Sequence, residues 1–220
     1  MIGNSKYTHI IPIGSNCRVS IATREIGLRD SSMPLDWCLS SMKCVNLLFT
    51  DGFKDITNHE CCSKETFTLP SGNKHDYILN TKYNLNITHE DVIGESFINK
   101  YNRRVMRMHE ILDDKSSNVL FVRNSLDGII HDPLHRYYLG TEYDHPSDDS
   151  DPTLIDSFVE IIQSTYPDLD FSVLVINHTN PLAFKSSRVF NITTEVNQND
   201  RLWDEKACIY HIDKFIKEGI

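Results

Sequence analysis

The chain has 220 residues, and 40% of them are hydrophobic, which is enough for one sizeable core. Its formal net charge is −9, and the excess of acidic residues lies almost entirely in residues 111–220. This balance is a poor match to nucleic acid or to an anionic membrane surface, because both attract a basic face, so we expect neither as a partner.

The first strand is predicted over residues 7–13, where apolar and β-branched side chains follow one another. Gly14-Ser15-Asn16 interrupts this strand. A helix is predicted to begin near Cys17 and to end at Gly27, because glycine commonly terminates helices. We therefore expect Cys17 to lie in a tight turn between a strand and a helix.

A second helix is predicted to be capped by Asp36 and to end near Gly52. Residues 53–90 are rich in loop-forming residues and contain one predicted strand, His75–Leu79. A long helix is predicted from about residue 90 to residue 114, because apolar residues recur there at intervals of three and four.

Apolar strands and amphipathic helices continue in the second half of the chain. The predicted elements are a strand at 118–122, a helix capped by Asp151 with Pro152 in its first turn, strands at 171–176 and 188–192, a short strand at 207–210 and a last helix at 213–218. Residues of about 124–151 form an irregular, acidic insertion. Such a long irregular segment is unusual in a compact domain, which predicts a functional or mobile role.

Strands that alternate with helices favour an α/β fold in which a mainly parallel sheet is flanked by helices, and we predict one such domain over residues 1–220. The chain has no run of 18 apolar residues, and residues 1–9 are polar and lack a hydrophobic signal region. We therefore expect a cytoplasmic protein whose six cysteines are thiols.

Cys17 stands where a thiol is chemically useful. The N-terminus of a helix stabilises negative charge and lowers the pKa of a thiol, and the thiolate is the nucleophilic form. Backbone N–H groups of the same turn can hold an oxyanion, and the Asn16 side chain can add a donor. The alternative is a buried structural cysteine behind a tight turn, because cysteine is among the most buried residue types.

Four short motifs follow one another along the first half of the chain. They are Ile13-Gly14-Ser15-Asn16-Cys17-Arg18-Val19, Pro34-Leu35-Asp36-Trp37, His75-Asp76 and Tyr101-Asn102-Arg103-Arg104. In this order they resemble the strand–GSNC–helix opening, the Pro-Phe-Asp-Trp segment, the His-Asp pair and the Tyr-x-Arg-Arg helix of a known family, the otherwise uncharacterised papain-like cysteine peptidases. Leu35 keeps an apolar side chain where the family has Phe. The resemblance extends over roughly residues 8–125.

This resemblance implies that Cys17 is the nucleophile and that His75 is its base, with a papain-like α+β fold as the alternative architecture. A third polar group must orient the imidazole. Asp76 is adjacent to His75 in a strand, so its side chain should point to the opposite face. We therefore predict that Asp36 orients His75.

The ends of the predicted strands leave a second histidine open as the base. Ligands of open α/β sheets bind at the carboxyl ends of the strands, and Cys17, Asn124 and His178 each follow a predicted strand. If these strands are neighbours, His178 can replace His75. The sequence does not determine the strand order.

These features predict a cysteine-dependent acyl hydrolase or transferase, and by resemblance a peptidase, that acts on a protein, a peptide or a small acyl substrate. We expect it to need no cofactor and no metal. Ser15 and Arg103 are the predicted substrate contacts, and a guanidinium can anchor a carboxylate or a phosphate. Two alternatives stay open, an SGNH- or lipase-like hydrolase in which Ser15 attacks, and a catalytically inactive α/β binding domain.

Overall fold

The main sheet of the protein is parallel. The computed structural model describes residues 6–68, 72–124, 151–177, 182–194 and 203–218. Four strands pair in the order β1-β6-β7-β8, and their bounds are β1 (His9–Pro12), β6 (Asn118–Asn124), β7 (Asp170–Asn177) and β8 (Val189–Thr193). The predicted α/β fold with a parallel sheet is confirmed.

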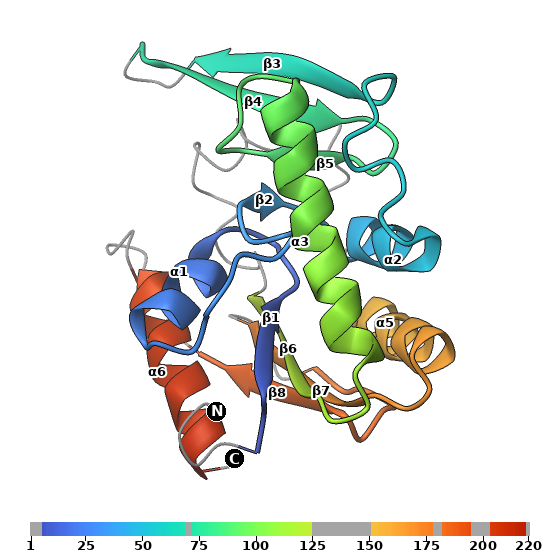
Figure 1. The fold of residues 1–220 in the computed structure, drawn as a ribbon. Coiled ribbons are helices and arrows are strands. Elements are labelled where there is room, and N and C mark those ends of the chain that lie inside the picture. The colour runs from blue at the N-terminus through green and yellow to red at the C-terminus, as the bar shows by residue number, and fades with distance from the viewer. Residues whose placement is uncertain (1–5, 69–71, 125–150, 178–181, 195–202, 219–220) are drawn as a thin grey trace.

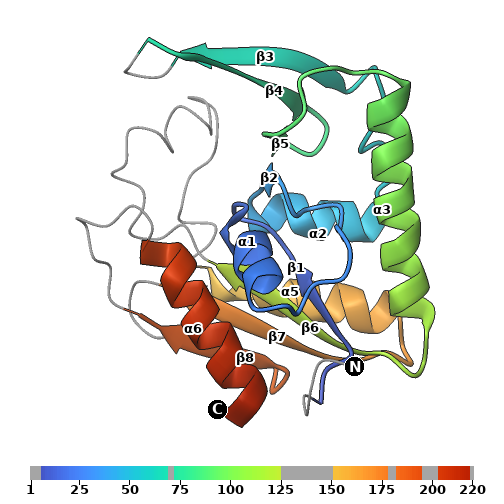
Figure 2. The ribbon, with the colours of Figure 1, turned by 60° about the vertical axis from the view of Figure 1, so that its left-hand side comes forward.

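Helices cover both faces of this sheet (Figures 1 and 2). One face packs against α1 (Arg18–Glu25) and α6 (Trp203–Glu218), and the other packs against α2 (Met42–Asp51), α3 (Glu95–Asp113) and α5 (Pro152–Thr165). Side chains alternate along β6, so Phe121 belongs to the core under α2, α3 and α5, whereas Leu120 and Val122 belong to the core under α1 and α6.

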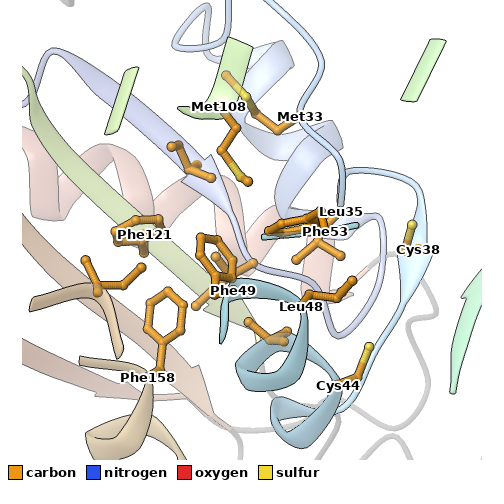
Figure 3. Close-up of a cluster of buried hydrophobic side chains, with 14 of the residues drawn as sticks. Met33, Leu35, Cys38, Cys44, Leu48, Phe49, Phe53, Met108, Phe121 and Phe158 are labelled. Atoms are coloured by element: carbon orange, nitrogen blue, oxygen red, sulfur yellow. The ribbon is translucent and has the colours of Figure 1, made fainter. Parts of the chain in front are cut away.

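Phenylalanine rings cluster in the larger of the two cores (Figure 3). The ring of Phe49 on α2 meets the rings of Phe121 on β6 and Phe158 on α5 edge to face, with centroid separations of 6.1 and 5.1 Å. Phe121 and Phe158 are themselves 5.1 Å apart. This cluster holds two helices against one face of the sheet, because edge-to-face pairs add to the free energy of burying the rings.

A second, antiparallel sheet stands beyond the main sheet, and α3 reaches from one to the other (Figure 1). Its strands are β2 (Cys38–Leu39), β3 (Cys62–Thr68), β4 (Lys74–Asn80) and β5 (Leu85–Ile87), in the order β2-β5-β4-β3. The prediction of one strand in residues 53–90 was wrong, because three form there. Polar residues interrupt β3, so periodicity gave no signal, and its pairing with β4 defines it.

The predicted helix cap at Asp36 was also wrong. The second helix, α2, begins at Met42, and its cap is Ser41, whose Oγ accepts a hydrogen bond of 3.0 Å from the N–H of Cys44. The backbone after Asp36 is extended instead, because Cys38 and Leu39 pair with β5. The Asp36 carboxylate forms an ion pair with Arg29 instead.

The C-terminal end of the chain differs from the prediction as well. Residues 207–210 were expected to form a short strand, but they belong to the 16-residue helix α6. The buried residues Cys208, Ile212 and Phe215 recur at helical intervals and pack on the main sheet with α1. This tertiary contact selects the helix over the strand for a short apolar segment.

Other boundaries lie close to their predicted places. Asp151 caps α5, with its Oδ1 accepting from the N–H of Thr153 at 2.9 Å and with Pro152 in the first turn. The long helix α3 begins at Glu95, later than predicted. Most of the acidic insertion predicted at about 124–151 lies outside the described residues. In the described part of the chain, no helix is long and apolar enough to cross a membrane.

Candidate active site

A strained turn joins β1 to α1 at the carboxyl end of the main sheet. Gly14 and Ser15 both have positive φ angles, 81° and 45°, and a positive φ is uncommon for a residue other than glycine. The N–H of Ser40 donates to the carbonyl oxygen of Ser15 at 3.3 Å, which links the turn to the residue after β2. The hydroxyl of Ser15 donates to the carbonyl oxygen of Asn124. The turn is therefore tied to both sheets.

Gly14 is required at this turn for a second reason besides its φ angle. A Cβ atom built on Gly14 would overlap the Oγ of Ser40 and would lie 3.4 Å from the guanidinium of Arg123. The backbone of the turn and the chain after β2 approach as closely as they do because Gly14 has no side chain.

Arg123 also links the end of β1 to the residue after β2. Its side chain is 1% exposed. Its guanidinium donates to the carbonyl oxygens of Ile13 at 2.9 Å and of Ser40 at 2.8 Å. A buried guanidinium is costly unless it is hydrogen-bonded, and these bonds join the end of β1 to the end of β2. The rigid turn positions the residue that follows it, Cys17.

Cys17 stands at the N-cap of α1 with a partly exposed side chain. Its carbonyl oxygen accepts from the N–H of Ile21 at 3.0 Å, which is the first bond of the helix. All six cysteines are in the described part of the chain, and they are thiols rather than disulfides. Cys17 and Cys61 are partly exposed, whereas the other four are buried, and burial raises the pKa of Cys38 to about 12. Solvent thus reaches Cys17 better than most of the thiols.

Asn16 lies beside this thiol and is only 3% exposed. Its Oδ1 accepts from the N–H of Arg18, the first residue of α1, at 2.9 Å, which satisfies one of the N–H groups that the first turn of a helix leaves free. Within the described residues its Nδ2 has no hydrogen-bond partner. The donor predicted from the sequence is therefore present next to Cys17 and is not used by the fold.

Ser15, the alternative nucleophile, is in a different situation. Its side chain is 0% exposed, and its hydroxyl proton is used by the carbonyl oxygen of Asn124. A main-chain carbonyl cannot accept a proton as a general base does. The engaged hydroxyl suits a residue that holds the turn and disfavours attack by Ser15, whereas contact of Ser15 with substrate stays a prediction.

Asp36 is buried in an ionic network under α1. Its carboxylate pairs with Arg29 at 2.9 Å and accepts from the N–H of Met33 at 2.8 Å and from the hydroxyl of Ser20 at 3.3 Å. Burial raises the pKa of Asp36, and the Arg29 guanidinium opposes that shift. Within the described residues, none of the contacts of Asp36 involves His75, so its orienting role stays a prediction.

His75 lies on β4 in a cleft whose lining includes Thr88 and His89. Its Nε2 is 3.0 Å from the carbonyl oxygen of Thr88. A carbonyl only accepts, so Nε2 carries the proton in this contact and Nδ1 is the basic nitrogen. The ring is thus oriented by a main-chain oxygen. His89 packs against Trp37 at 5.1 Å, and burial, with a contribution from His75, lowers the pKa of His89.

The roles of the remaining predicted site residues, Arg103 and His178, stay open. Arg103 is exposed on α3, and its role as a substrate anchor stays a prediction. His178 lies outside the described residues, so its role as the alternative base is equally open. The strand order does place the end of β6 between the ends of β1 and β7, as that alternative required. In the described part of the chain, no cluster of three or more His, Cys, Asp or Glu residues could hold a metal ion.

Two partners of the predicted residues were not predicted from the sequence. Arg29 pairs with Asp36, and His89 shares the cleft with His75. Arg29 carried no distinguishing local signal, because the six residues that separate it from Asp36 include a proline turn. His89 follows a short strand whose existence depends on pairing with β2 and β4.

The fold and the site define an α/β protein with a partly exposed thiol at a strained strand–turn–helix junction. A family model described as "Putative papain-like cysteine peptidase (DUF1796)" matches residues 8–181, and the chain belongs to this family. The match extends beyond the segment over which the motifs suggested a resemblance. No curated protein matches the chain, and no solved structure matches it.

Proposed function

We propose that the protein is a thiol-dependent acyl hydrolase, in the manner of a cysteine peptidase, with Cys17 as its nucleophile. The observation that carries this proposal is the position of Cys17, which is partly exposed at the start of α1 beside the unused amide donor of Asn16. A helix N-terminus favours the thiolate form. The strained turn, with Gly14 and Ser15 at positive φ, holds the thiol in place.

The proposed reaction has two steps. The Cys17 thiolate attacks a carbonyl carbon, and the resulting oxyanion accepts hydrogen bonds from backbone N–H groups of the turn and from Asn16. The bond to the leaving group then breaks, and a protonated imidazole donates its proton to that group. Water, deprotonated by the same imidazole, attacks the thioester, which releases the acid and restores the thiol.

The imidazole in this proposal is that of His75, with His178 as the alternative. The contact between Nε2 of His75 and Thr88 supports His75, because it leaves Nδ1 as the basic nitrogen. The substrate class is a protein, a peptide or a small acyl compound. Six cysteines that are all free thiols fit a reducing compartment, so the proposal includes a cytoplasmic location.

Alkylation with iodoacetamide tests the nucleophile, and Cys61 supplies the matched control. Both thiols are partly exposed, but Cys61 lies in the turn before β3, away from any helix N-terminus. We expect Cys17 to be alkylated about tenfold faster than Cys61 at pH 7, measured by mass spectrometry of tryptic peptides. The Cys17→Ala variant should lose the fast phase, and Cys61→Ala should keep it.

Equal rates at the two cysteines would contradict the proposal and would leave a binding domain that retains the fold. The base is tested on the same fast phase. His75→Gln should slow the alkylation of Cys17 near neutral pH if His75 forms the ion pair with the thiolate, and His178→Gln should slow it if the alternative holds.

A further inference from the structure

Buried polar atoms without partners gather at the carboxyl end of the main sheet. Within the residues that the structure describes, Nδ2 of Asn16, Oγ of Ser40, and both Nδ2 and Oδ1 of Asn124 have no hydrogen-bond partner. These residues surround one turn. Ser15 donates to the main chain of Asn124 and pairs with Ser40, and Asn16 is its neighbour in the chain.

Asn124 is the last residue of β6, and its side chain is 0% exposed. Leu120 and Val122 of the same strand pack in the core under α1 and α6. Side chains alternate along a strand, so Asn124 continues this face by one position. It therefore lies at the edge and on the face where Cys17 begins α1.

Burial of the Asn124 carboxamide without hydrogen bonds lowers the stability of the folded state. Each buried polar atom that lacks a hydrogen bond destabilises the native state, whereas an apolar side chain of the same shape would not. Asn80, an asparagine that serves the fold, has hydrogen-bond partners on both edges of its amide. Asn80 is equally buried, but its Nδ2 donates to the carbonyl oxygens of Asp55 and Ile56, and its Oδ1 accepts from the N–H of Tyr83.

A carboxamide offers one donor edge and one acceptor edge side by side. In an extended peptide, the N–H and the C=O of a single residue point to the same side, as in a hydrogen-bonded pair of antiparallel strands. Both edges of one asparagine can therefore be satisfied by one residue of such a chain. A simple ester or thioester has no N–H to offer, so it leaves Oδ1 without a donor.

We propose that Asn124 is a substrate-binding residue whose carboxamide binds the main-chain N–H and C=O of one residue in an extended peptide beside Cys17. This inference rests on the proposed function of Cys17 and adds to it a residue that selects peptide-like substrates. The two hydrogen bonds that the fold leaves unmade are made by the substrate.

The first test compares thermal unfolding of Asn124→Leu and Asn80→Leu. Removal of unpartnered polar atoms should stabilise the protein, so we expect Asn124→Leu to raise Tm by about 2–4 °C. Asn80→Leu removes bonded groups and should lower Tm. A fall of Tm in Asn124→Leu would overturn the proposal, because it would assign the carboxamide to the fold.

The second test uses two thiol reagents on the wild type and on Asn124→Leu. One is acetyl-alanyl-alanyl chloromethyl ketone, whose chloride is displaced by the Cys17 thiolate as a carbon–sulfur bond forms. The other is methyl methanethiosulfonate, which has no amide group. We expect Asn124→Leu to slow the peptidyl reagent about tenfold and to leave the small reagent unchanged, because only the peptidyl reagent can make the two hydrogen bonds.

The two reagents separate the possible failures. If the wild-type Cys17 reacts with methyl methanethiosulfonate no faster than Cys61, the proposed function fails. If Cys17 reacts faster than Cys61 but the peptidyl reagent modifies Asn124→Leu at the wild-type rate, only the role of Asn124 is overturned. A binding experiment tests Asn124 without using the reactivity of the thiol. Calorimetry compares the affinity of acetyl-dialanine amide for Cys17→Ala with its affinity for the Cys17→Ala/Asn124→Leu double variant. A loss of about tenfold in affinity supports the role, and equal affinity overturns it.

Discussion

At the scale of single residues, the turn before Cys17 shows how backbone conformation places a side chain. Gly14 and Ser15 at positive φ reverse the chain sharply, so that the helix starts three residues later. Such backbone is held only where surrounding contacts over-determine it. Here the bonds of Arg123 and of the Ser15 hydroxyl do so.

Gly14→Ala should destabilise the protein more than Gly27→Ala. Both glycines have positive φ angles, 81° and 69°, so both substitutions cost roughly 1–2 kcal/mol in backbone strain. A Cβ at Gly14 would also overlap the Oγ of Ser40, whereas a Cβ at Gly27 meets nothing within 4 Å. Urea denaturation of the two variants measures the difference. Equal losses would mean that Ser40 moves aside at no cost.

At the scale of elements, local sequence predicts a helix better than it predicts the residue that caps it. Asp36 and Ser41 are both good N-cap residue types, and the structure selects Ser41. The choice depends on Arg29, because its ion pair with Asp36 and the pairing of β2 with β5 keep the chain out of a helix until Met42.

Ser41→Ala should lower the free energy of unfolding by about 1 kcal/mol, since it leaves the N–H of Cys44 without its side-chain acceptor. The control is Ser157→Ala within α5. The Ser157 hydroxyl donates back to the carbonyl oxygen of Thr153, which the helix does not require. That variant should stay within about 0.5 kcal/mol of the wild type. Thermal unfolding that shows equal effects would contradict the assignment of the cap.

At the scale of the whole molecule, burial of histidines makes stability depend on pH. Burial lowers the pKa of His9, His89 and His211 below the ordinary value of 6.5. The unfolded chain then binds more protons than the folded chain just below pH 6.5, so stability rises with pH there. The contribution is present in full above about pH 6.5 and is lost as pH falls through the lowered pKa values.

We therefore expect the free energy of unfolding to fall when pH is lowered from 7 to 5, and His211→Gln to reduce that slope. His211 lies on α6 and is not one of the residues assigned to the candidate site. The control is His59→Gln, because His59 is exposed in a turn. Denaturant titrations across this pH range measure the slopes. A wild-type slope shared by both variants would show that burial of His211 has no effect on stability.

Much of the architecture follows from local pattern. The sequence predicted the main strands and helices in their order along the chain. It also predicted the cap of α5 at Asp151 and the position of Cys17 after a strand and before a helix, because periodicity and turn residues are properties of neighbours in the sequence. The strand predicted at 207–210 failed for the converse reason. A four-residue apolar segment is ambiguous until the partner that buries it is known.

The sequence by itself determined the α/β fold, the family and the thiol at the turn, since each is written in residues that are close together in the chain. Only the tertiary structure decided which groups the site contains. Ser15 meets Asn124 across 109 positions and Arg123 meets Ser40 across 83, and these contacts leave the carboxamide of Asn124 buried with nothing to bind. The unmet hydrogen bonds of a buried side chain depend on every element packed around it, so no local pattern contains them.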